Sequence, residues 1–146
     1  MPKILIDADG CPVVEETIEL ASAYHVEVMI VCDTSHYYAF EDVKVIMADK
    51  GRDASDFLLL RNVEKNDIII TQDYGLAALA LSKHAIVLSQ NGFHYTEENI
   101  DSYLQQRHTS SKMRKQGHHT HIKKRSAEDD ERFIECLQQT LDDMEI

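Results

Sequence analysis

The chain has 146 residues and a formal net charge of −11 at pH 7, and hydrophobic residues make up 43% of it. This length and composition predict one soluble globular domain, residues 1–146, with a sizeable buried core. The acidic charge argues against a general nucleic-acid binder, because phosphates repel an acidic surface. No run reaches the about 18 apolar residues of a membrane span. The three cysteines form no CxxC pair, so we expect a cytoplasmic protein without a membrane partner.

Taken in chain order, the first half alternates apolar runs with amphipathic segments. The run at Lys3–Ile6 is typical of a buried strand, and Pro12 suits the first turn of the helix that follows. Two further β-branched runs, at 26–32 and 43–47, predict the second and third strands. Gly51-Arg52-Asp53 then opens a helix.

The second half continues the alternation, with strands at 67–71 and 85–88 and an Ala- and Leu-rich helix between them. Thr96 is a predicted helix cap, and an amphipathic helix spans about 127–144. The whole pattern predicts an α/β fold, with a doubly wound parallel sheet of about five strands in the order 3-2-1-4-5.

Aspartates follow the first and fourth predicted strands. Asp7 and Asp9 end the first strand, Asp73 ends the fourth, and Asp53 and Asp56 lie three residues apart at a helix start. In a sheet of this order, strands one and four are neighbours at the switch point where sites form. Converging carboxylates repel one another, and a hard cation such as Mg²⁺ or Mn²⁺ removes that conflict. We therefore predict a metal site, with helix capping as the alternative role of each aspartate.

Two families have a similar start. Ile4-Leu5-Ile6-Asp7-Ala8-Asp9 resembles the first motif of the haloacid-dehalogenase-like phosphatases, which implies a nucleophile at Asp7 and a general acid at Asp9. Cys11 departs from that motif, which has Thr or Val there. The Lys motif and late acidic pair of those phosphatases have no clear counterpart in the expected order.

The second resemblance covers nearly the whole chain. Four motifs in order resemble the YaiI/YqxD family of bacterial proteins, which is placed among PIN-like domains: DADGCPV at 7–13, GRDASDFLL at 51–59, NDIIITQDYGLA at 66–77 and NGFHYTEENI at 91–100. The resemblance implies a PIN-like fold with an acidic nuclease site. The residues it implies are catalytic Asp7, Asp53 and Asp73, metal ligands Asp7, Asp9, Asp56 and Asp73, and Thr71 supporting the last acid.

A basic, histidine-rich stretch at about 107–125 contrasts with the acidic remainder. It holds seven of the fifteen Lys and Arg residues, four of the eight histidines and no acid. Without a sustained apolar period, it is a loop, an arm or a weak helix. Such charge segregation suggests either an anionic partner or docking on the protein's own acidic surface. The candidates for phosphate contact are Arg107, Lys112, Arg114, Lys115, Lys123, Lys124 and Arg125.

Together these features favour a nuclease that uses Mg²⁺ or Mn²⁺ and acts on single-stranded RNA, with the basic stretch holding the backbone. Two alternatives stay open. One is a small-molecule phosphatase or phosphotransferase with Asp7 as nucleophile, and the other is a non-catalytic RNA-binding module whose acids are structural. Tyr37, Tyr38 and Phe40, after the second strand, either stack on bases or cap the core.

Overall fold

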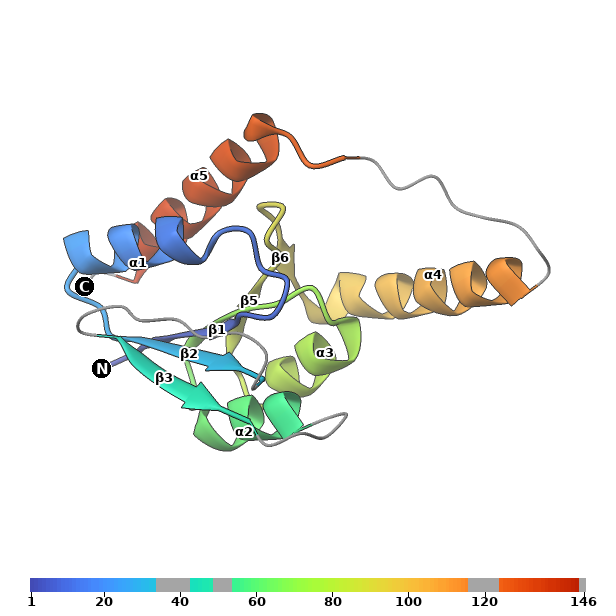
Figure 1. Ribbon diagram of the computed structural model, residues 1–146, viewed down its shortest axis with the longest axis horizontal. Coiled ribbons are helices and arrows are strands. Elements are labelled where there is room, and N and C mark those ends of the chain that lie inside the picture. Colours follow the sequence, from blue (N-terminus) through green and yellow to red (C-terminus); the bar gives the residue numbers. More distant parts are fainter. Residues whose placement is uncertain (34–42, 49–53, 116–123, 145–146) are drawn as a thin grey trace.

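The computed structural model describes residues 1–33, 43–48, 54–115 and 124–144, with the side chains of 54 and 107–115 left out. Within these ranges, six strands form one sheet with helices on both faces (Figure 1). The strands are β1 (Ile4–Asp7), β2 (Val28–Cys32), β3 (Lys44–Met47), β4 (Ile68–Ile70), β5 (Ile86–Leu88) and β6 (His94–Tyr95). The helices are α1 (Val14–Ala23), α2 (Ala54–Asn62), α3 (Tyr74–Ser82), α4 (Glu97–Lys115) and α5 (Ala127–Asp143).

The strand order is β3-β2-β1-β4-β5-β6, so the predicted α/β fold and the order 3-2-1-4-5 are confirmed. The first five strands pair in parallel, and β1 lies between β2 and β4. β6 adds an antiparallel edge strand that the sequence pattern does not predict. Two residues are too short for an alternation that distinguishes a strand from a loop.

Alternate residues of the central strands build two cores. Ile4 and Ile6 of β1 face one side, where α1 and α5 cover the sheet and α5 contributes Phe133, Leu137 and Leu141. Leu5 of β1 faces the other side, which α2, α3 and the start of α4 cover. Each fully buried Leu, Ile or Phe stabilises the fold by about 1.5–3 kcal/mol relative to exposure. Burial on both faces explains why β1 reads as a continuous apolar run.

Capping residues fix where the helices begin. Thr96, the predicted cap of α4, accepts a hydrogen bond at Oγ1 from Asn99 N at 3.2 Å, while Asn99 Oδ1 accepts from Thr96 N at 2.8 Å. Ser126 and Asp129 form the corresponding capping box at the start of α5. These reciprocal bonds satisfy backbone groups that the first turn of a helix leaves without partners.

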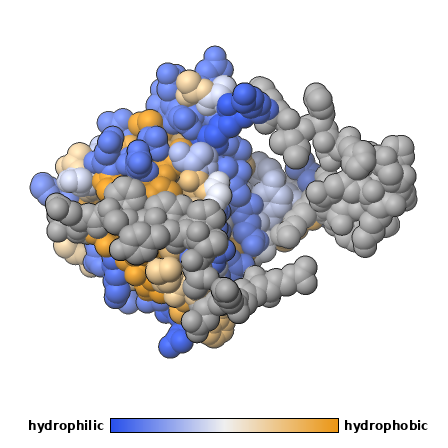
Figure 2. Space-filling model, viewed as in Figure 1, coloured by the Kyte–Doolittle hydropathy of each residue, from blue (hydrophilic) through white to orange (hydrophobic). Residues whose placement is uncertain are grey.

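α4 projects from the body of the molecule, and its last residues, 107–115, are the beginning of the basic stretch (Figure 1). Figure 2 shows apolar residues gathered over the sheet and hydrophilic residues between the sheet and the far end of α4. None of the helices in the described ranges is long and apolar enough to span a membrane.

Candidate functional site

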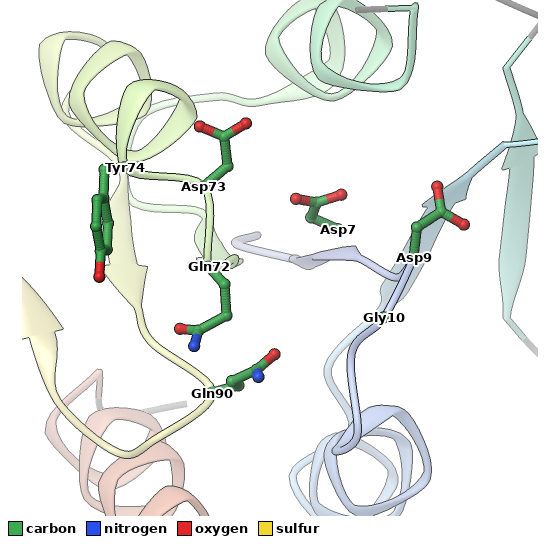
Figure 3. Close-up of a pocket in the computed structure, with 7 residues that line it drawn as sticks. All are labelled: Asp7, Asp9, Gly10, Gln72, Asp73, Tyr74 and Gln90. Carbon is green, nitrogen blue, oxygen red and sulfur yellow. The ribbon is translucent and has the colours of Figure 1, made fainter. Parts of the chain in front are cut away.

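The carboxyl ends of β1 and β4 lie side by side and bring two predicted acids to one pocket. Asp7 is the last residue of β1, and Asp73 follows β4 as the residue that caps α3. Because β1 pairs with β2 on one side and with β4 on the other, this is the switch point of the sheet. Figure 3 shows both carboxylates beside the same cavity, which has a volume of about 540 Å³.

Thr71 links the two acids. Its Oγ1 donates a hydrogen bond to Asp7 Oδ2 at 2.8 Å and accepts one from Asp73 N at 3.0 Å. Since a hydroxyl has one proton to donate, the bond to Asp73 N leaves that proton directed at the Asp7 carboxylate. Thr71 is itself buried, so this arrangement is shielded from competing water. The predicted supporting role of Thr71 therefore has a defined geometry.

The carboxyl group of Asp7 has a raised pKa. Burial raises the pKa of its carboxyl to about 6, and the nearby charges of Asp73 and Asp9 raise that pKa further, against the lowering effect of the Thr71 hydrogen bond. The predicted repulsion among the acids is thus present in the fold, although desolvation is the larger cause. A carboxyl with this pKa is poised between its two protonation states close to neutral pH.

Asp73 has two roles at once. Its Oδ1 accepts a hydrogen bond from Leu76 N at 3.1 Å, which caps α3, and the same residue lines the pocket. The sequence left two roles open for each aspartate, capping a helix or lining a site. Asp73 has both roles. The cap also fixes the side chain, because the helix start restricts where the carboxylate can lie.

Asp9 lies across the pocket from Asp73 and is oriented differently from Asp7 (Figure 3). Its Oδ2 accepts a hydrogen bond from Asp33 N at 2.9 Å, which ties the loop after β1 to the end of β2. Gly10 follows with φ of +74°, a conformation that residues with a Cβ rarely adopt. The backbone thus turns sharply directly after Asp9, whose carboxylate is bound to the residue that follows β2.

Of the two remaining predicted acids, the structure describes only Asp56. Asp56 lies in the first turn of α2, half-buried, and does not line the pocket. Asp53 lies outside the described residues, as do Tyr37, Tyr38 and Phe40. In the described ranges, no group of three or more His, Cys, Asp or Glu side chains is arranged to hold a metal ion.

Four residues of the pocket were not predicted as site residues from the sequence: Gly10, Gln72, Tyr74 and Gln90. Gln72 and Tyr74 flank Asp73 in the chain, so their position next to the fourth strand was the available signal. Gln90 follows β5 at the same edge of the sheet. The carboxamide of Gln72 is held at Oε1 by the hydroxyl of Ser89, which donates at 2.8 Å.

The basic candidates divide into separate groups. Arg107, Lys112, Arg114 and Lys115 belong to the C-terminal half of α4, while Lys123 lies outside the described residues and Lys124 is exposed. Arg125 instead binds the protein itself. Its guanidinium donates to Gln90 O and to Asn91 Oδ1, each at 2.7 Å, and to Asp130 Oδ1 at 2.8 Å.

Arg125 therefore joins the start of α5 to the loop that carries Gln90. Gly92 in the same loop lies so close to α5 that a Cβ there would come within 2.5 Å of the Arg132 carbonyl. The loop that carries Gln90 is thus held by the hydrogen bonds of Arg125 and by the close packing of Gly92 on α5.

Comparisons with known proteins identify relatives over almost the whole chain. Residues 5–143 match the family model described as "Uncharacterized BCR, YaiI/YqxD family". A UPF0178 protein of Natranaerobius thermophilus is 47% identical over 140 residues, covering 95% of each chain. A UPF0178 protein of Alkaliphilus oremlandii is 45% identical over 142 residues, which are 97% of this chain and 92% of that one. No solved structure matches the chain.

Proposed function

The chain belongs to the YaiI/YqxD family, and from its carboxylate pocket we propose that it is a divalent-metal-dependent nuclease that hydrolyses single-stranded RNA. The observation that carries the proposal is the meeting of Asp7 and Asp73 at the ends of neighbouring parallel strands, in one pocket. The motif resemblance to PIN-like domains supports the same role for these acids.

The residues of the pocket fit a hard cation. The carboxylate residues Asp7 and Asp73 line it, and Mg²⁺ and Mn²⁺ prefer oxygen ligands such as carboxylates. Mg²⁺ is commonly bound through one or two carboxylates, with water and substrate phosphate completing its shell. Asp7 and Asp73 in one pocket match this mode of binding. The chemistry that such a cation supplies is activation of water and neutralisation of charge on the phosphate.

The protein's own residues hold the site in place. Thr71 orients Asp7 through its hydroxyl and holds the backbone of Asp73 through its oxygen. The cap at Leu76 N restrains the Asp73 carboxylate. Such restraint matters because misplacement of a reacting group by about 1 Å can reduce a rate by two orders of magnitude. The basic residues in the C-terminal half of α4 would attract the phosphate backbone, which is the reason for choosing a nucleic acid as substrate.

The experiment is cleavage of an end-labelled single-stranded RNA by purified protein with Mn²⁺ or Mg²⁺. We expect cleavage that EDTA abolishes and that Asp7→Asn and Asp73→Asn each abolish. Asn caps a helix as well as Asp does, so Asp73→Asn removes the charge and keeps the start of α3. Asp101→Asn, an exposed carboxylate in α4, is the matched control and should cleave like the wild type.

Three results would contradict the proposal. Equal cleavage by wild type and both pocket variants would assign the activity to a contaminating nuclease. Turnover of a phosphomonoester with a trapped aspartyl-phosphate at Asp7 would instead establish the phosphatase alternative. RNA binding without any cleavage, unchanged in both variants, would establish the non-catalytic alternative.

A further inference from the structure

The pocket has an aromatic wall next to its carboxylates. Tyr74 directly follows Asp73, is half-buried and lines the cavity. Figure 3 shows its ring at the side of the pocket away from Asp9, with Gln72 and Gln90 also reaching into the space between. The ring packs against the core on one side, and its carbon atoms supply no ligand to a cation, so what it offers to the cavity is distinct from what the acids offer.

Other aromatic rings hold Tyr74 in place. The ring of Tyr103 lies 5.3 Å from it, centroid to centroid, at an angle of 36°, and Tyr95 meets it edge-on at 6.0 Å. Tyr103 in turn stacks on Phe93 at 5.3 Å and 18°. Neither Tyr103 nor Phe93 lines the cavity, so they support Tyr74 from outside it. A ring fixed in this way loses little conformational freedom when a ligand stacks on it.

Of the two carboxamides in the pocket, that of Gln72 is held by a side-chain hydrogen bond, and the backbone that carries that of Gln90 is held as well. Ser89 Oγ, fully buried, donates to Gln72 Oε1 and accepts from Asn91 N at 3.1 Å. The backbone of Gln90 is held by Arg125 at 2.7 Å. A carboxamide offers a donor and an acceptor side by side, which matches the edge of a nucleobase.

These parts correspond to the parts of one nucleotide. The acids suit a phosphate with its cation, the carboxamides suit a base edge, and Tyr74 offers a stacking surface for the base. The volume of about 540 Å³ lies within the range of small-ligand sites, about 300–1,000 Å³. In a duplex the faces of a base are covered by its neighbours, so only an unpaired or extruded base can stack on a protein ring.

We propose that the pocket takes one unpaired nucleotide, whose base stacks on Tyr74 within reach of Gln72 and Gln90 beside the phosphate that is attacked. The position of the phosphate rests on the proposed nuclease function, whereas the stacking site does not depend on catalysis. The inference therefore restricts the substrate to single strands or to unpaired nucleotides in loops and at ends.

The test is a binding comparison between two fluorescently labelled six-residue single strands of equal charge, in Mg²⁺. One is hexa-adenylate, and the other has the same backbone without bases. A gel after each titration verifies that the strands are intact. We expect the wild type to bind the base-containing strand at least about ten-fold more tightly. Tyr74→Ala should reduce this preference to less than about two-fold, whereas Tyr74→Phe should keep it.

Two further variants separate stacking from folding. Tyr74→Leu keeps apolar packing against Tyr103 but lacks an aromatic face, so it should lose the preference while melting like the wild type. Tyr24→Ala changes a half-buried tyrosine that packs against the core on the α1 and α5 side of the sheet, and it should retain the preference. Equal affinity of the wild type for both strands would overturn the inference, as would a preference that survives in both Tyr74→Ala and Tyr74→Leu. A Tyr74-dependent preference without RNA cleavage would support this site and refute the nuclease.

Discussion

Replacing Asp7 with Asn should stabilise the metal-free protein at neutral and alkaline pH. Burial and the charges of Asp73 and Asp9 disfavour the ionised form of Asp7 and raise its pKa to about 6. Asn has nearly the same shape and no charge. Its side-chain oxygen can still accept the hydrogen bond that Thr71 Oγ1 now donates to Asp7 Oδ2. The substitution therefore removes the unfavourable charge and keeps the contact.

The magnitude follows from the difference between the folded and unfolded pKa values. A rise from 3.8 to about 6 corresponds to a penalty of about 3 kcal/mol on the ionised native state. Between these values the native state binds more protons than the unfolded state. The contribution of Asp7 to the free energy of unfolding is thus fully present below about pH 4 and is lost as pH rises through about 6. Asp7→Asn should gain up to about 3 kcal/mol at pH 8, or ~5–10 °C in Tm, and little at pH 4.

The assay is thermal melting followed by circular dichroism in EDTA from pH 4 to pH 8, with Asp101→Asn as the control. Only the difference between each variant and the wild type is interpreted, because other groups also titrate in this range. A difference for Asp7→Asn that is absent at pH 8, or equal at pH 4 and pH 8, would refute the reasoning. Adding Mn²⁺ at pH 8 should then raise the Tm of the wild type more than that of the variant.

Three other variants have defined outcomes. Thr71→Val removes the hydroxyl that links Asp7 and Asp73, so RNA cleavage should fall and urea denaturation should show a loss of about 1–3 kcal/mol. Asp67→Ala leaves the half-buried Lys3 ammonium without the carboxylate that now lies 2.8 Å away, and should cost about 3–5 kcal/mol in the same assay. In anisotropy titrations with RNA, replacing the basic residues of α4 by Ala should flatten the salt dependence by about 0.7 in log–log slope per lost phosphate contact. Those residues are Arg107, Lys112, Arg114 and Lys115.

The sequence was sufficient for the five parallel strands and for placing Asp7 and Asp73 at the same edge of the sheet, because both follow from periodicity and one topological rule. Apolar runs alternating with helices predict a parallel sheet, and the order 3-2-1-4-5 makes the first and fourth strands neighbours. Residues at the carboxyl ends of those strands must then lie at the same edge. No tertiary detail is needed for that step.

Side-chain direction in the loops could not be predicted in the same way. Asp9 is two residues from Asp7, yet the turn at Gly10 places its carboxylate against Asp33 N. Gln90 enters the pocket because the loop after β5 packs closely on α5, which lies far away in the sequence. Such positions depend on contacts between distant segments, and neither periodicity nor local propensity encodes them.

Arg125 belongs to the basic stretch by its charge, but in the structure it has a different role from the exposed Lys124. In the sequence Arg125 directly follows Lys123 and Lys124, and its charge alone does not distinguish it from Lys124. In the fold its guanidinium is committed to Gln90, Asn91 and Asp130. A planar guanidinium with several fixed donors suits this multiple contact better than an ammonium does.

These hydrogen bonds of Arg125 connect one end of the basic stretch to the pocket. The stretch begins on α4, whose Tyr103 lies against Tyr74. It ends at Arg125, which precedes α5 and donates a hydrogen bond to the backbone of Gln90. Both of its ends are therefore attached to residues that line the cavity or support its wall. If the proposed RNA binding uses the basic residues of α4, the strand should reach the pocket on the side of Tyr74, because α4 also carries Tyr103.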